Sequence, residues 1–77
     1  MFKKVEEIRK ESGMSQIEFA ELLGDSRRTY LNRITGIQPY WTIDELIKAA
    51  EFNKGKVTVE VMGKTYNITI KEIPISE

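Results

Sequence analysis

The strongest constraint on the fold is a stretch with regularly placed glycines, SQIEFAELLGDSRRTYLNRITG, over residues 15–36. Ser15 and Glu18 form a capping box, which predicts a helix that begins directly after Ser15. Gly24 suits the left-handed conformation that ends a helix, and a further helix expected over 26–35 is followed by another glycine. The stretch therefore predicts two short helices joined by a tight turn.

Signals of the same kind predict two more helices and then a change to strands. Apolar spacing predicts a first helix over residues 2–12, and a second capping box, formed by Thr42 and Glu45, predicts a fourth helix over 43–52. After the fourth helix the apolar residues alternate with polar ones, which predicts a hairpin over 56–73. We expect one domain over residues 1–77, mainly α with a C-terminal antiparallel β-hairpin.

The hairpin has one apolar face in its expected register. A two-residue type II′ turn at Gly63 and Lys64 pairs each apolar residue with an apolar partner. The expected pairs are Val61 with Tyr66, Val59 with Ile68 and Val57 with Ile70. This face either covers the helices or forms a dimer interface, because a two-stranded ribbon presents open edges.

Other apolar residues are expected to face the core from the helices and from the loop GIQPYW. In the first helix they are Phe2, Val5 and Ile8, in the loop Ile37, Tyr40 and Trp41, and in the fourth helix Ile43, Leu46, Ile47 and Ala50.

Composition makes several classes of function improbable. The chain has no cysteine and no histidine, so it lacks thiolate metal ligands and the commonest acid–base catalyst. We expect no catalytic residue, no metal, no cofactor and no small-molecule substrate. The N-terminal MFKKVEEIRK lacks the apolar run of a signal peptide, and no stretch has the length of a membrane span. We therefore expect a cytoplasmic, non-enzymatic protein without a membrane partner.

The charge is zero overall but is unevenly distributed. Twelve basic residues balance twelve acidic ones, which argues mildly against a partner as acidic as DNA. Residues 26–36, however, hold Arg27, Arg28 and Arg33 and no acid. The positive charge is therefore concentrated on the helix that follows the glycine turn.

The stretch resembles the Cro/C1-type helix-turn-helix repressors of phages and bacteria, and the resemblance covers residues 2–52. The residues that carry it are Gln16, Ala20, the Leu22-Leu23-Gly24 ending, Ser26-Arg27 and Gly36. The resemblance implies a lambda-repressor-like four-helix domain that binds double-stranded DNA in a sequence-specific way. It also implies a homodimer on a pseudo-palindromic operator, in which helix 26–35 reads the major groove.

The family's contact positions can be carried over to this chain. Arginine can read guanine and asparagine can read adenine, which agrees with the side chains on helix 26–35. The expected DNA-binding residues are Gln16, Ser26, Arg27, Arg28, Thr29, Asn32 and Arg33. The expected dimer contacts are Val57, Val59, Val61, Tyr66, Ile68 and Ile70.

Two positions depart from the family pattern, because Asp25 and Arg33 stand where aliphatic residues are usual. Either Asp25 or Ser26 caps helix 26–35. If Asp25 is not the cap, its carboxylate lies near the expected DNA phosphates and should lower the affinity for DNA. Depending on the helix register, either Leu31 or Arg33 faces outward. The alternative function is a protein-interaction module of inhibitor or anti-defence type, in which the arginine-rich helix docks on an acidic protein.

Overall fold

A computed structural model describes residues 1–38 and 40–70 of the chain. In this part, four α-helices and a short 3-10 helix precede a two-stranded antiparallel sheet. The elements are α1 (Val5–Ser12), α2 (Gln16–Leu23), α3 (Arg27–Thr35), α4 (Ile43–Ala50), the 3-10 helix η1 (Glu51–Asn53), β1 (Lys56–Val61) and β2 (Lys64–Thr69). The expected helical domain with a C-terminal hairpin is confirmed.

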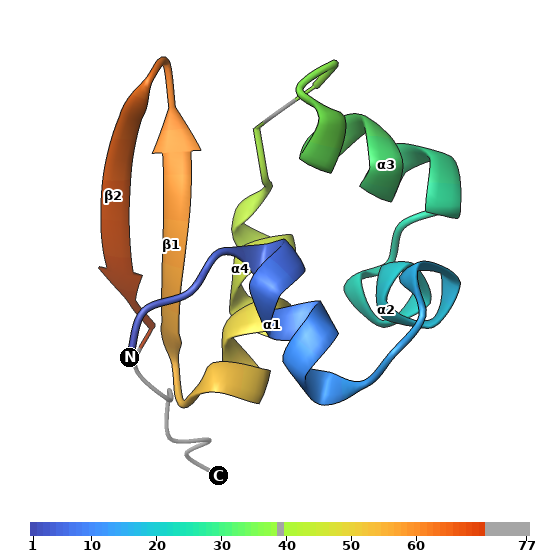
Figure 1. The fold of residues 1–77 in the computed structure, drawn as a ribbon, viewed down its shortest axis with the longest axis horizontal. Coiled ribbons are helices and arrows are strands. Elements are labelled where there is room, and N and C mark those ends of the chain that lie inside the picture. Colours follow the sequence, from blue (N-terminus) through green and yellow to red (C-terminus); the bar gives the residue numbers. More distant parts are fainter. Residues whose placement is uncertain (39, 71–77) are drawn as a thin grey trace, which may run out of the picture.

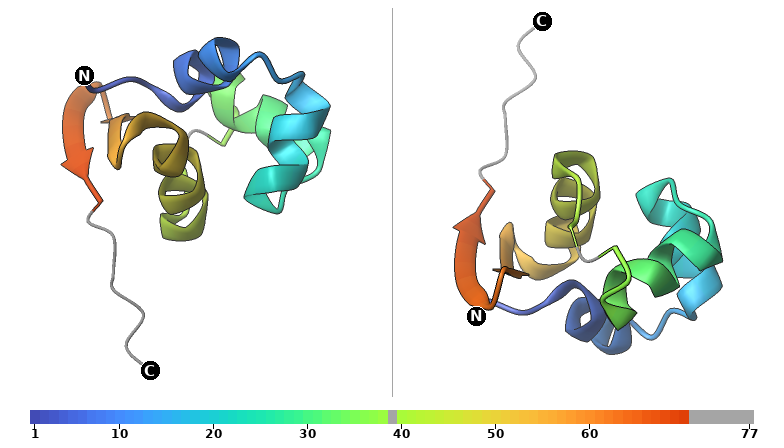
Figure 2. Two further views of the ribbon diagram at one scale, coloured as in Figure 1. Left: turned by 90° about the horizontal axis from the view of Figure 1, so that it is seen from below. Right: turned by 90° about the horizontal axis from the view of Figure 1, so that it is seen from above.

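The helices form the body of the molecule and the hairpin lies against one side of it. Helices α1 and α4 occupy the middle, with the hairpin on one side and α2 and α3 on the other (Figure 1). Two perpendicular views show the same order (Figure 2). Helix α3 therefore lies across α1 and α4 from the hairpin, and its C-terminal residues 33–35 line a pocket together with residues 58–60 of β1.

A single hydrophobic core joins these elements. Its aromatic centre is Phe19, whose ring lies 6.0 Å from that of Tyr30 and 5.7 Å from that of Phe52. Trp41 extends the group, with its ring 5.6 Å from Tyr30. The buried apolar residues are Val5, Ile8, Phe19, Ala20, Leu23, Tyr30, Leu46, Ala49, Ala50, Val57 and Val59. Each large side chain in this set contributes roughly 1.5–3 kcal/mol by leaving water.

The predicted helix caps are present. The backbone N–H of Glu18 donates to the hydroxyl of Ser15, and that of Glu45 donates to the hydroxyl of Thr42. Each glutamate carboxylate accepts a bond from the N–H of its capping residue in return, which completes both capping boxes. Helix α3 is capped by Ser26, whose hydroxyl accepts the N–H of Thr29 at 3.1 Å. The choice between Asp25 and Ser26 as its cap is thereby settled.

The predicted hairpin register is wrong by two residues. Val61 pairs with Lys64, so the turn consists of Met62 and Gly63. Both have positive φ, 51° and 79°, as a type I′ turn requires, whereas the expected type II′ turn needs positive φ only at its first residue. The pairs are Val57 with Ile68 and Val59 with Tyr66. A shift of two preserves the apolar face, so the alternation pattern could not distinguish the two registers.

The first helix begins later than expected. Helix α1 starts at Val5, because Lys3 and Lys4 run beside β1 instead of continuing the helix. The N–H of Thr58 donates to the carbonyl of Lys3 at 2.8 Å. Phe2 lies outside the helix, with the ammonium of Lys56 5.8 Å from its ring centre. The N-terminal segment thus covers part of the outer edge of β1.

Several residues expected in the core around α4 are exposed. Ile37, Tyr40 and Ile43 are 72, 56 and 70% exposed. Helix α4 turns Glu45, Leu46, Ala49 and Ala50 toward the core, which leaves Ile43 outside it. Helix α4 also ends at Ala50 and continues as η1, instead of running to residue 52. Of the loop residues, Trp41 packs against the core as expected.

Candidate nucleic-acid interface

Helices α2 and α3 are joined by a tight turn that fixes their crossing. Ala20 in α2 is fully buried, so a small residue lies at the contact between the helices. Gly24 has φ 85°, and the following N–H of Asp25 donates to the carbonyl of Ala20 at 2.8 Å. This is the helix-turn-helix arrangement, in which the first helix supports the second.

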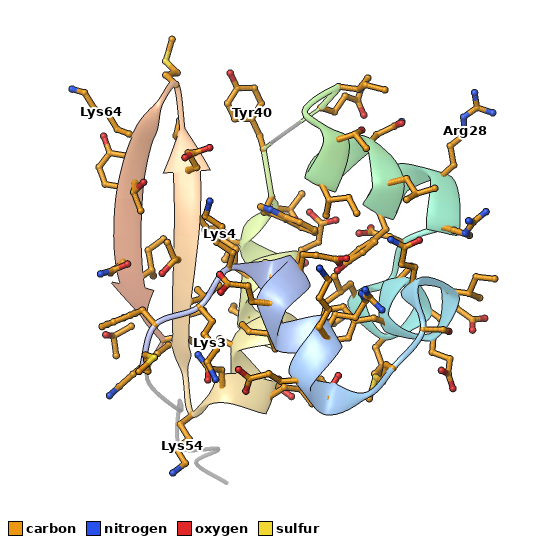
Figure 3. All side chains as sticks on the ribbon, in the orientation of Figure 1. Lys3, Lys4, Arg28, Tyr40, Lys54 and Lys64 are labelled. Atoms are coloured by element: carbon orange, nitrogen blue, oxygen red, sulfur yellow. The ribbon has the colours of Figure 1, made fainter. Side chains whose placement is uncertain are left out.

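The outward side of α3 carries most of the polar residues that the sequence nominated. Arg27 and Arg28 are exposed, and Arg28 extends away from the body of the molecule (Figure 3). Ser26 is also exposed at the N-terminus of α3, while Thr29 and Asn32 are partly buried. Within residues 1–38 and 40–70, neither of these two guanidinium groups forms an ion pair.

Gln16, the nominated residue outside α3, opens α2 as expected. Its side chain is partly buried. It follows the cap Ser15 directly, so it belongs to the first turn of α2, where the backbone N–H groups have no helical acceptor. That position suits contact with an anion.

The inner side of α3 is fixed to α1 by a polar network around Glu6. Tyr30 is fully buried, and its hydroxyl donates to Oε1 of Glu6 at 2.7 Å. Arg9 donates to both oxygens of Glu6 and to the carbonyl of Met14 at 2.7 Å. Burial raises the pKa of Glu6, but the hydrogen bonds from Arg9 and Tyr30 outweigh it and leave this pKa below its ordinary value. The carboxylate therefore stays ionised and holds α3 in place.

Arg33 was expected among the outward DNA-binding residues, and this expectation is wrong. Its Nε donates to Oε2 of Glu45 at 3.2 Å, and its Nη1 donates to the carbonyl of Gln38 at 3.4 Å. Its side chain is only 15% exposed and that of Glu45 only 2%. Arg33 thus faces α4, whereas Leu31 is partly exposed and lies outside the core cluster. The open question of register is answered in favour of Leu31 outward.

Asp25 also turns inward. The two residues that depart from the family pattern, Asp25 and Arg33, therefore both lie beside Glu45. The carboxyl group of Asp25 lies in hydrogen-bonding contact with that of Glu45, beside Arg33. Sequence reasoning missed Glu45, which it treated only as part of a capping box. The signal that could have found it is the opposite charge of Asp25 and Arg33 at two positions where aliphatic side chains usually pack together.

The environment separates the pKa values of the two carboxyl groups. Burial, together with the hydrogen bond and the negative charge of Glu45, raises the pKa of Asp25 to about 7 against the opposing charges of Arg33 and Lys48. Burial also acts to raise the pKa of Glu45, but hydrogen bonds from Asp25, Thr42 and Arg33 lower it below its ordinary value. Between pH 4.5 and about 7, Glu45 is therefore the ionised member of this pair and Asp25 the protonated one.

The hairpin residues nominated for dimerisation divide into two groups. Val57 and Val59 are buried against the helices, and Val61, Ile68 and Ile70 pack partly against the same core. Tyr66 is 48% exposed although its paired residue Val59 is buried. The apolar face of the hairpin therefore covers the helical body, which was the first of its two expected roles.

These features together define a helix-turn-helix protein of the DNA-binding class. A family model described as helix-turn-helix matches residues 5–58, and the chain belongs to this family, the Cro/C1 type. The chain is thus a DNA-binding helix-turn-helix regulator in general terms, and its family is not one of enzymes. No curated protein and no solved structure matches the chain significantly.

The described residues hold neither a metal-binding cluster nor a membrane-spanning helix. Within 1–38 and 40–70, no group of three or more acidic, cysteine or histidine side chains is arranged to hold a metal ion. None of the helices in these ranges has the length and apolar character needed to cross a membrane.

Proposed function

We propose that this chain is a sequence-specific transcriptional regulator, a repressor of phage or mobile-element type, that reads the DNA major groove with α3. The observation that carries the proposal is the division of α3 into two sides. Tyr30 and Arg33 fix its inner side to α1 and α4 through Glu6 and Glu45. Arg28 projects from its outer side (Figure 3). A rigidly held helix with free arginines is what base reading requires.

Each outward residue has a role in this proposal. Arg28 and Asn32 contact base edges, because their side chains can make paired hydrogen bonds to guanine and adenine. Gln16, Ser26, Arg27 and Thr29 contact phosphates from the N-terminal turns of α2 and α3 and set the register on the duplex. Bound at a promoter in the cytoplasm, the whole of residues 1–77 acts as one domain that excludes other proteins from the same DNA.

A pseudo-palindromic operator requires two copies of the chain, and the outer edge of β2 is the proposed contact. No described segment lies beside that edge, whereas β1 is flanked by β2 and by the N-terminal segment. The register turns the backbone N–H and C=O groups of Thr65, Asn67 and Thr69 outward. Antiparallel pairing of two such edges would satisfy these groups across a two-fold axis and leave the nearby Tyr66 available for contact.

We expect the purified protein to form a homodimer at micromolar concentration. Sedimentation equilibrium should give twice the mass of the chain, and Asn67→Pro should shift the protein to monomer, because proline removes an outward N–H on the edge of β2. Asn67 pairs with Thr58 at a position where the two backbones exchange no hydrogen bond. The change removes the exposed bond from the hydroxyl of Thr58 to Oδ1 of Asn67, at 2.8 Å, but no ladder bond, so the hairpin should survive it. A wild-type monomer up to about millimolar concentration would remove both the dimer and the palindromic operator.

Selection of bound sequences from a random double-stranded DNA pool tests the function directly. At low ionic strength we expect retained sequences with two similar half-sites in inverted orientation, about one helical turn apart. If the folded protein retains no DNA under these conditions, the chain is instead the protein-interaction module, with the arginine-rich α3 docked on an acidic protein.

A further inference from the structure

We propose that Asp25 and Glu45 share one proton across their contact, and that this proton links the folded placement of α3, and with it DNA binding, to pH. The second part of this proposal rests on the function proposed above. The first part concerns the folded chain alone.

A hydrogen between these two carboxyl groups accounts for the buried oxygen of Asp25 that otherwise has no partner among the described residues. Oδ2 of Asp25 is buried, and no donor from residues 1–38 or 40–70 reaches it. Glu45 is 2% exposed, and its oxygens accept bonds from the backbone of Thr42 at 2.6 Å and from Arg33 at 3.2 Å. Two ionised carboxylates in contact repel each other, whereas a proton on Asp25 turns the contact into a hydrogen bond and satisfies the buried oxygen.

The charges around the pair favour one negative charge there and not two. The charged groups that act on Asp25 are Arg33 from α3 and Glu45 and Lys48 from α4. Nζ of Lys48 lies close to the turn, 3.6 Å from the position that a Cβ on Gly24 would take. Arg33 forms an ion pair with Glu45. The single negative charge is therefore paired when it lies on Glu45 and the proton lies on Asp25.

The raised pKa of Asp25 makes the stability of the fold depend on pH. The pKa of Asp25 rises from its ordinary 3.8 to about 7 on folding, so between these pH values the folded chain holds a proton that the unfolded chain has lost. Stability from this group is complete below pH 3.8, falls as the pH rises, and is lost above pH 7. The depressed pKa of Glu45 acts in the opposite sense, but only below its ordinary value of 4.5.

DNA binding should take up the same proton. Asp25 precedes the N-terminus of α3, where the proposed phosphate contacts lie, and negative phosphates favour the neutral form of a nearby carboxyl group. The chain has no histidine, the side chain that usually titrates between pH 6 and 8. Loss of affinity over this interval would therefore point to the Asp25–Glu45 pair.

The decisive measurement is a ¹³C NMR titration of the side-chain carboxyl groups in the wild-type protein without DNA. We expect Asp25 to titrate at about pH 7 and Glu45 below 4.5. Titration of Asp25 near its ordinary 3.8 would overturn the shared proton. This result does not depend on whether the chain binds DNA.

Urea unfolding of variants gives the second measurement. Between pH 5 and 7.5 the unfolding equilibrium constant of the wild type should rise roughly tenfold, since the limit is a factor of ten per pH unit and Asp25 is only partly buried. Asp25→Asn should remove this rise, because the amide donates to Glu45 without titrating. The matched control Glu21→Gln, which changes an exposed carboxylate on α2, should keep it. Equal pH dependence in Asp25→Asn and the wild type would contradict the proposal.

The DNA part is tested on the best sequence from the pool selection. From pH 6 to 8 the wild type should lose about threefold in affinity, the effect of half a pKa unit between free and bound states, and Asp25→Asn should lose less. The same loss in both proteins would overturn the link to DNA while leaving the NMR result standing. Retention of no DNA at all would overturn the proposed function and this link together, and again not the shared proton.

Discussion

Replacing Arg33 by alanine is expected to lower the free energy of unfolding by about 3 kcal/mol at pH 7.5, or to abolish cooperative unfolding altogether. Arg33 supplies the cation that pairs with Glu45, which is only 2% exposed. Its removal leaves a buried carboxylate without a counter-charge and next to a second carboxyl group, that of Asp25. Leaving an uncompensated buried charge is among the most destabilising single changes.

Urea unfolding with two companion variants checks this expectation. Arg27→Ala removes an exposed arginine from the same helix and should change the free energy of unfolding by no more than about 0.5 kcal/mol. Arg33→Lys keeps the positive charge but loses the planar geometry that reaches both Glu45 and the carbonyl of Gln38, so its effect should lie between the other two. Similar stabilities for Arg33→Ala and Arg27→Ala would show that Arg33 is an ordinary surface residue.

The helices could be predicted because their ends are encoded locally. The capping residues Ser15 and Thr42, each with a glutamate three positions later, and the left-handed glycines Gly24 and Gly36 act within one or two turns of the chain. Local hydrogen bonds of this kind do not depend on the rest of the fold. The hairpin faces were predictable for a similar reason, since alternation determines the face whatever the pairing.

What could not be predicted depends on contacts between distant segments. The late start of α1 reflects pairing of Lys3 and Lys4 with β1, more than fifty residues away. The inward position of Arg33 depends on Glu45, which lies on another helix and whose capping box with Thr42 gives no sign of a second partner. In the hairpin, a turn with Gly63 first and a turn with Gly63 second both keep the apolar face, so only the full packing selects the register.

The second large effect is expected on DNA. Arg28→Ala and Asn32→Ala should each cost roughly 1–3 kcal/mol on the preferred site, because each removes a paired contact to one base edge. The loss should be smaller on unrelated sequences, so the preference at a single base pair relaxes. Arg28 is exposed on α3, and its replacement should leave the free energy of unfolding nearly unchanged.

Phosphate contacts should respond differently, which gives a matched comparison on the same helices. Arg27→Ala should weaken binding to all sequences alike and reduce the salt slope by about one unit. Gln16→Ala should also weaken all sequences alike, but it removes no charge, so the salt slope should stay the same. Identical behaviour of Arg27→Ala and Arg28→Ala would mean that α3 meets DNA without reading its bases.

The most direct test of the account is the affinity of the wild type and of Arg28→Ala for the DNA sequence selected best from the random pool, measured at one salt concentration together with a scrambled sequence. We expect about tenfold or greater loss of affinity for Arg28→Ala on the selected sequence, and a smaller loss on the scrambled one. Equal affinities of the two proteins for the selected sequence would contradict the claim that the outward side of α3 reads DNA.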